Sequence, residues 1–285
     1  MANRGARELA RRIRLEGRLR GRLGTAAVLA FGLSFQPALA GTMLVQPHRA
    51  VYSLKLEQSA VAADIGSLNG RMVMEWRGGP ACDGYIVNQR IVTDVSDSDG
   101  NSMVRDLRLS SWEAADGDRF HFELDQFING KRMDRLSGKA TRDTKNAAAL
   151  FDMPVGVTLE LPEDVVFPSE FTVKLLETAA AGTRMLTVSV FEGAESDRRY
   201  DVTAIMGKKL PVEESNVSHA LLEGVGAWPV HMSYFDPTVE EGVPDYEVSY
   251  WLFANGISSS LLMDYGDFSM RGDLLELDYL EPDDC

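Results

Sequence analysis

The sequence has few of the residues that carry catalysis or bind metals. It contains only four histidines, His48, His121, His219 and His231, and none lies in an HExxH motif or at another recognised ligand spacing. It also lacks a GxSxG nucleophile elbow, a GxGxxG dinucleotide motif, a P-loop and an EF-hand loop. We therefore expect a protein that is not an enzyme, with no catalytic residues, no cofactor and no metal.

Basic residues are scarce outside the N-terminal segment. Residues 1–22 hold eight arginines and two glutamates, and the rest of the chain holds 21 basic and 41 acidic residues, a balance of −20. A surface of this sign repels nucleic acids and anionic lipid surfaces, so we expect no nucleic-acid partner. Charge alone does not separate a soluble protein from one that binds cations or a basic partner.

The N-terminal segment has the order of a secretory signal. The arginine-rich residues precede the apolar run GTAAVLAFGLSF and an A-x-A cleavage site at Ala38-Leu39-Ala40. The apolar run is too short for a membrane span, which needs about 20 residues. We predict a signal peptide over 1–40, cleaved after Ala40, and export of residues 41–285. A basic amphipathic helix on a cytoplasmic protein is the alternative.

Only two cysteines occur, Cys82 and Cys285. An even number of cysteines in an exported protein favours a disulfide, and here it would close a loop of about 200 residues. Such a bond would hold the C-terminal tail against an early part of the chain. A redox-active or metal-binding thiol and an intermolecular disulfide are the alternatives.

Alternation of apolar and polar residues dominates residues 41–285. It is clearest where Phe120, Phe122 and Leu124 alternate with polar neighbours, and Asn255-Gly256 between two such runs indicates a hairpin. A single helix is predicted over 168–182, and a long loop over 208–227. No linker or repeat divides the chain, so we predict one all-β antiparallel domain over 41–285. Strands are predicted over 48–58, 69–79, 84–95, 102–114, 118–128, 184–193, 199–207, 229–236, 245–256 and 257–272.

Three smaller features complete the predictions. Gly266 and Gly272 interrupt the last alternating run, so we expect turns or bends at both. The acidic segment DVSDSDGNS (94–102) could bind a cation weakly, but a solvated hairpin loop explains it better. The strand aromatics are interpreted as core residues: Trp112, Phe120, Phe122, Trp228, Tyr234, Tyr250 and Trp251.

Six long blocks of the sequence are unusual enough to compare with known families: HRAVYSLKL (48–56), GRMVMEW (70–76), CDGYIVNQR (82–90), WPVHMSYFD (228–236), GVPDYEVSYWLFANGI (242–257) and MDYGDFSMRG (263–272). In this order, they resemble the EipB-type cell-envelope integrity proteins of alphaproteobacteria, long classed as a domain of unknown function. The resemblance spans almost all of 41–285 and ends in a C-terminal cysteine, whereas 137–165 and 192–222 match more loosely.

The resemblance implies a periplasmic protein with a β-spiral, a long antiparallel sheet of about fourteen strands coiled into a barrel-like oval, with one or two short helices. It implies an intramolecular disulfide between Cys82 and Cys285, a role in envelope integrity under stress, and a tetratricopeptide-repeat protein as a periplasmic partner. We expect a mostly monomeric protein. It implies no catalytic residue.

Three hypotheses about function follow. The first is a non-enzymatic periplasmic protein that supports the cell envelope through protein binding or scaffolding. The second is a carrier of a lipid or another hydrophobic envelope ligand, because a coiled sheet can hold an apolar groove. The third is a glycan hydrolase, for which no carboxylate pair can be chosen among so many acids.

Overall fold

The computed structural model describes residues 45–144, 146–215, 217–239 and 242–281. By the contacts that residues make with one another, the chain divides into two units, Met1–Ala40 and Gly41–Cys285. All of the described residues belong to the second unit. The predicted signal peptide over 1–40 and its cleavage after Ala40 lie outside the described residues, so both stay predictions. The same holds for the domain boundaries at 41 and 285.

Fourteen strands of the described chain form a single antiparallel sheet. The first eight are β1 (His48–Ser59), β2 (Ser67–Gly79), β3 (Gly84–Ser96), β4 (Ser102–Ala114), β5 (Arg119–Ile128), β6 (Lys131–Arg142), β7 (Ala147–Met153) and β8 (Thr158–Leu161). The other six are β9 (Met185–Val190), β10 (Tyr200–Met206), β11 (Ala227–Phe235), β12 (Tyr246–Phe253), β13 (Ser258–Asp264) and β14 (Phe268–Tyr279). The helices are α1 (Pro168–Ala180) and the short 3-10 helices η1 (Val61–Ala63), η2 (Pro80–Cys82), η3 (Val212–Ser215) and η4 (Ala220–Leu222). The predicted all-β fold is confirmed.

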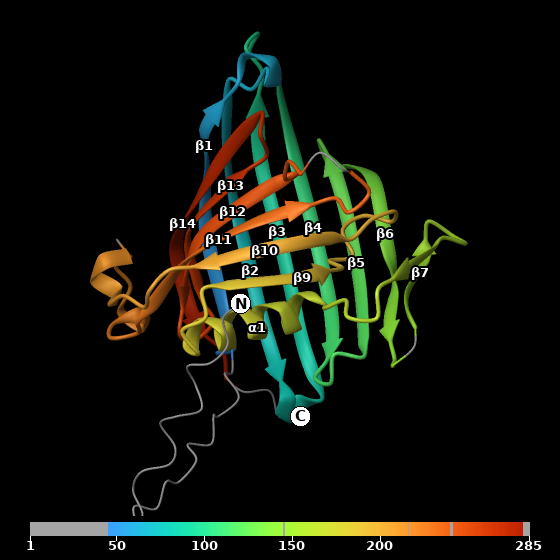
Figure 1. Ribbon diagram of the computed structural model, residues 1–285. Coiled ribbons are helices and arrows are strands. Elements are labelled where there is room, and N and C mark those ends of the chain that lie inside the picture. Colours follow the sequence, from blue (N-terminus) through green and yellow to red (C-terminus); the bar gives the residue numbers. More distant parts are fainter. Residues whose placement is uncertain (1–44, 145, 216, 240–241, 282–285) are drawn as a thin grey trace, which may run out of the picture. The chain divides into compact units, whose positions relative to one another are not determined.

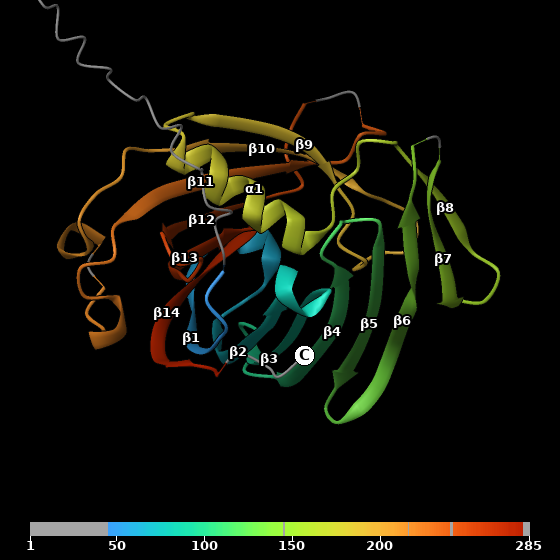
Figure 2. The same cartoon turned by 90° about the horizontal axis from the view of Figure 1, so that it is seen from below.

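The sheet is curled but does not close. Its strands follow the order β8-β7-β6-β5-β4-β3-β2-β1-β14-β13-β12-β11-β10-β9, so β1 lies between β2 and β14, while β8 and β9 form the two edges. Figures 1 and 2 show β9–β11 facing β2–β4 across the interior. A short parallel bridge, in which the Val166 N–H donates to the Ser189 carbonyl at 2.8 Å, connects the segment after β8 to β9.

Period-two alternation explains which face turns inward. On β5, Phe120, Phe122 and Leu124 point inward and are buried. His121 and Glu123 lie on the opposite, outer face of the strand, where His121 is exposed. Neighbouring strands repeat this pattern, so burial of one continuous apolar face curls the sheet around its own core. Trp112 differs from the prediction, because it packs on the outer face beside His121 with ring centroids 5.2 Å apart.

A cluster of phenylalanines fills the interior near β5–β7. Phe122 contacts Phe151 and Phe191 with ring centroids 5.4 and 5.5 Å apart, and Phe120 stacks on Phe167 at 5.2 Å. Beside these rings there is room only for small side chains. The small inward residues of β6 and β7 are Gly138, Ala140, Ala147 and Ala149.

The small inward residues explain why the sequence did not predict β6 and β7, whereas β8 has inward leucines but is only four residues long. Glycine and alanine weaken the apolar signal on which a period-two pattern depends. At Gly138 the packing requires glycine, because a Cβ would collide with the Leu150 carbonyl oxygen and lie 2.8 Å from the Phe122 ring. β6 and β7 are therefore specified by tertiary contacts more than by their own alternation.

The predicted helix over 168–182 is confirmed as α1, which lies beside β9 at the lower end of the sheet in Figure 1. Pro168 stands in its first turn, where proline suits the helical φ and no N–H is needed. Phe171, Leu175 and Leu176 are buried against the core. The chain leaves the helix through Gly182, whose φ of +75° suits glycine.

The predicted run over 257–272 is two strands with a turn between them. Gly266 lies in that turn with a φ of +81°, as predicted, and Gly256 makes the β12–β13 turn with a φ of +86°. The prediction of a bend at Gly272 is wrong, because Gly272 lies inside β14 and pairs with Leu54 and Leu261. A Cβ there would meet both leucines at 3.2 Å, so close packing accounts for this glycine.

Candidate functional site

The inner face of the sheet holds a cavity of about 440 Å³, which we call the inner cavity. Its walls come from the inward side chains of β2–β5 and from the β13–β14 hairpin. The volume falls within the range of small-molecule sites, which is about 300–1,000 Å³. Its apolar wall consists of Ile65, Leu68, Ile91, Val95, Leu107, Tyr265, Phe268 and Met270, and its polar groups include Thr93, Arg105 and Gln126.

A row of aromatic side chains leads from the core to the inner cavity. Tyr234 stacks on Tyr246 with ring centroids 4.2 Å apart, Tyr265 follows at 6.0 Å, and Phe268 lies 5.0 Å beyond Tyr265. The hydroxyl of Tyr246 donates a hydrogen bond of 2.9 Å to Glu192. Burial raises the pKa of Glu192 and, together with that carboxyl group, the pKa of Tyr246. The row fixes the position of the hairpin that closes one side of the cavity.

The charged residues that line the inner cavity are Arg105 and Asp106. Arg105 is exposed, and no residue in the described ranges forms an ion pair with it. The carboxylate of Asp106 accepts hydrogen bonds from Arg90 and Arg108 on the outer face of the sheet. The hydrogen bonds from these two arginines lower the pKa of Asp106 to about 2, so its negative charge is already paired. The cavity wall therefore carries a positive charge in an acidic protein.

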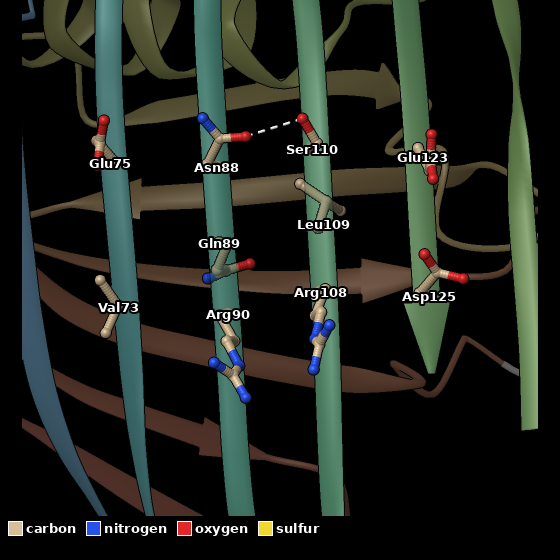
Figure 3. A pocket seen from close by; sticks show the side chains of 10 residues that line it. All are labelled: Val73, Glu75, Asn88, Gln89, Arg90, Arg108, Leu109, Ser110, Glu123 and Asp125. Atoms are coloured by element: carbon tan, nitrogen blue, oxygen red, sulfur yellow. Dashed lines mark hydrogen bonds between the residues drawn. The ribbon is translucent and has the colours of Figure 1, made fainter. Parts of the chain in front are cut away.

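A second depression, of about 300 Å³, lies on the outer face of β2–β5. Figure 3 shows Arg90 and Arg108 side by side there, with Glu123 and Asp125 on the next strand. Arg135 pairs with Glu123 at 2.7 Å, and the other charges also have partners. Exposed pairs of this kind contribute about 0–1 kcal/mol each, and they are typical of a solvated face.

A serine, a histidine and a glutamate lie within hydrogen-bond reach on the outer face. Ser249 Oγ is 2.8 Å from His231 Nδ1, and His231 Nε2 is 3.1 Å from Glu247 Oε1. This is the order of groups that activates a serine nucleophile. Acyl transfer also needs N–H donors aimed at an oxyanion and a cleft for the substrate. Ser249 instead lies in a central strand between β11 and β13, and the His231 side chain is 45% exposed.

Glu113 is a buried carboxyl group at the start of α1. It is 2% exposed, and its two oxygens accept hydrogen bonds of 2.7 Å from the backbone N–H groups of Ser169 and Glu170. These are donors that a helix leaves unpaired in its first turn, and the residue before α1 supplies no side-chain cap. Burial raises the pKa of Glu113 to about 7 despite these bonds. Glu113 therefore fastens α1 to β4.

Comparison with known proteins places this architecture in a family. The EipB-like family model matches residues 39–281. The chain belongs to the EipB-like family. It is 33% identical over 259 residues to the "Cell envelope integrity protein EipB" of Brucella abortus (strain 2308), covering 90% of this chain and 91% of that protein. It also matches the crystal structure of a beta-barrel-like protein of the domain of unknown function DUF1849 from Brucella abortus, with 33% identity and a TM-score of 0.78. That match covers 84% of this chain and 100% of the other.

Membership of the EipB-like family confirms the resemblance, and the fourteen strands confirm the coiled sheet that it implied. The disulfide that it implied remains a prediction. Cys82 is the last residue of η2, between β2 and β3, and Cys285 lies outside the described residues.

The histidines of this EipB-like chain are distributed over separate elements. His48 is buried in β1, His121 lies on β5, His219 precedes η4 and His231 lies on β11. Within the described ranges no group of three or more His, Cys, Asp or Glu side chains could hold a metal ion. In the acidic segment 94–102, Asp97 accepts hydrogen bonds from the backbone and side chain of Asn101, as a hairpin loop does.

Among the described residues, no helix has both the length and the apolar character needed to cross a membrane.

Proposed function

We propose that this chain is a non-enzymatic periplasmic protein that supports cell-envelope integrity through protein binding or scaffolding. The observation that carries the proposal is the similarity to a protein named for envelope integrity, which extends over 90% of this chain. The leader predicted over 1–40 supports export. The partner implied by the family resemblance is a periplasmic tetratricopeptide-repeat protein, and the protein acts mostly as a monomer.

The geometry supports binding in preference to catalysis. The relay of nucleophile, base and acid described above, Ser249–His231–Glu247, lies on the outer face of the paired central strands β11 and β12. The charged depression in Figure 3 is occupied by arginine–carboxylate pairs. Neither arrangement offers the preorganised donors that stabilise a transition state.

Complementation of a strain that lacks this gene tests the proposal. The full chain should restore resistance to detergent and to cell-wall antibiotics, whereas a chain without residues 1–40 should not. N-terminal sequencing of the protein from the periplasmic fraction should begin at Gly41. Ser249→Ala should complement as well as the wild type, and its failure to do so would favour an enzyme.

Partner binding has its own test. In-cell crosslinking followed by mass spectrometry should recover a tetratricopeptide-repeat protein with the full chain. Light scattering of the purified protein should give the mass of a monomer.

The inner cavity favours a second candidate, a carrier of a hydrophobic envelope ligand. Its wall is predominantly apolar, and its volume suits a small ligand. Native mass spectrometry of protein purified from the periplasm tests this candidate, since a carrier should retain a lipid-sized mass that denaturation releases.

A further inference from the structure

We propose that the inner cavity binds an amphiphile with an apolar chain and an anionic head group, and that Arg105 binds the head group. The proposal names the ligand class for the carrier function above and rests on that function.

The hydrocarbon chain of the ligand would lie against the apolar side chains that the two halves of the sheet contribute to the cavity. Leu68 and Met270 are buried there at 5% and 8% exposure, and they come from β2 and β14. Ile91 and Leu107 continue the same inward face on β3 and β4, since Ile91 pairs in register with Leu107. A hydrocarbon chain placed here leaves water for an apolar surface, which is the main source of affinity for such ligands.

The head group would lie at Arg105. This residue follows the inward alternation of Leu107 on β4 and pairs in register with Thr93 on β3, which also lines the cavity. A guanidinium offers several donors in a planar fork that matches the oxygens of a carboxylate or a phosphate. Arg90, one strand away, has its fork engaged by both oxygens of Asp106, whereas Arg105 has no ion-pair partner in the described ranges. The charge that remains available thus lies beside the apolar wall.

The exposure of the lining residues indicates where the ligand would enter. Arg105 is exposed and Tyr265 is 40% exposed, whereas Leu68 and Met270 are buried. The cavity therefore meets solvent near its charged residue and its aromatic hairpin. An amphiphile that enters chain first would keep its head group partly hydrated, which limits the cost of desolvating the charge.

The test measures binding to the purified mature chain by displacement of a fluorescent fatty acid. The ligands are palmitate, monohexadecyl phosphate and hexadecanol, which have the same chain and differ in head group, each below its micellar concentration. Palmitate or hexadecyl phosphate should bind more tightly than hexadecanol, and the tighter of the two identifies a carboxylate or a phosphate head group. Arg105→Gln should weaken binding of the anionic ligands about tenfold and leave hexadecanol within about twofold, because it removes one charge-assisted contact.

Two matched controls separate the cavity from general surface effects. Arg71→Gln removes an exposed arginine from the outer face of β2 and should leave all three affinities unchanged. Leu107→Trp fills the cavity and should abolish binding, whereas Val104→Trp places the same ring on the outer face of β4, where Val104 is 40% exposed, and should not. Circular dichroism checks that each variant is folded; if Leu107→Trp is not, Arg105→Gln still decides, since its site is exposed.

If neither palmitate nor monohexadecyl phosphate binds more tightly than hexadecanol, or if Arg105→Gln and Arg71→Gln lose the same affinity, the proposal is overturned. Complementation is measured in parallel. A chain that restores envelope resistance but binds none of the three amphiphiles overturns the cavity inference and leaves the envelope function standing. A chain that binds palmitate through Arg105 but restores no resistance supports the ligand assignment and overturns the envelope function.

Discussion

Replacing Glu113 by glutamine should remove a pH dependence from the stability of the protein. The folded protein raises the pKa of this carboxyl group from 4.5 to about 7, chiefly through burial. Between these two pH values the folded state binds a proton that the unfolded state releases, so the free energy of unfolding falls as pH rises. A shift of this size corresponds to about 3 kcal/mol between pH 4 and pH 8.

The measurement is urea denaturation, followed by circular dichroism, at pH 4, 5, 6, 7 and 8. The relevant quantity is the free energy of unfolding of the wild type minus that of Glu113→Gln. It should fall by about 3 kcal/mol from pH 4 to pH 8. The subtraction cancels the titration of other groups, among them Glu192 and His48, whose pKa values burial also shifts.

Glu177→Gln is the matched control. It replaces an exposed glutamate of the same helix by the same residue type and should not reproduce the fall of about 3 kcal/mol that burial of Glu113 causes. Parallel stability curves for the wild type and Glu113→Gln would refute the reasoning, because they would mean that the carboxyl group is hydrated or ionised at no cost in the folded state. A difference that rises with pH would mean that its bonds to Ser169 and Glu170 outweigh burial.

Three further predictions concern stability. If the predicted Cys82–Cys285 disulfide forms, Cys82→Ser should lower the free energy of unfolding by about 2–5 kcal/mol, and reductant should lower the melting temperature of the wild type but not of the variant. Phe120→Ala should cost about 3–5 kcal/mol in urea denaturation, since this buried ring contacts three other phenylalanines, whereas Phe127→Ala on the outer face should cost less than about 1 kcal/mol. Gly138→Val should cost at least about 1–3 kcal/mol by the same assay, because its side chain would collide with the Leu150 carbonyl oxygen as well as with Phe122, and pairing it with Phe122→Leu should recover only the part that comes from Phe122.

The sequence predicted most of the strands because their alternation depends on burial alone. Every residue of β5 that it placed inward, such as Phe120 and Phe122, is buried. It failed where a strand packs against large neighbours, as Gly138 does, because a small residue has no apolar signal of its own. The prediction of a bend at Gly272 was wrong because, in the sequence, a glycine that close packing requires cannot be told from a glycine at a turn.

The inner cavity could not be predicted from the sequence. Leu68 and Phe268 line it together although 200 positions separate them, and only the pairing of β1 with both β2 and β14 brings them to one place. The role of Glu113 was hidden for a similar reason, since the helix it caps begins 55 residues later. Alternation determines which face a residue occupies, but strand order determines its neighbours.

The position of β1 has a consequence for how the protein reaches its folded state. β1 pairs with β2 along one edge and with β14 along the other. One row of its N–H and C=O groups therefore remains unpaired until β14, the last strand in the sequence, has been made. During synthesis from the N-terminus, that row stays open to any other extended chain until nearly all of the polypeptide has been made. Contacts between such distant segments also slow folding. The most vulnerable time for this protein is therefore the interval before its final strand arrives, when a chaperone that covers β1 would protect it from aggregation.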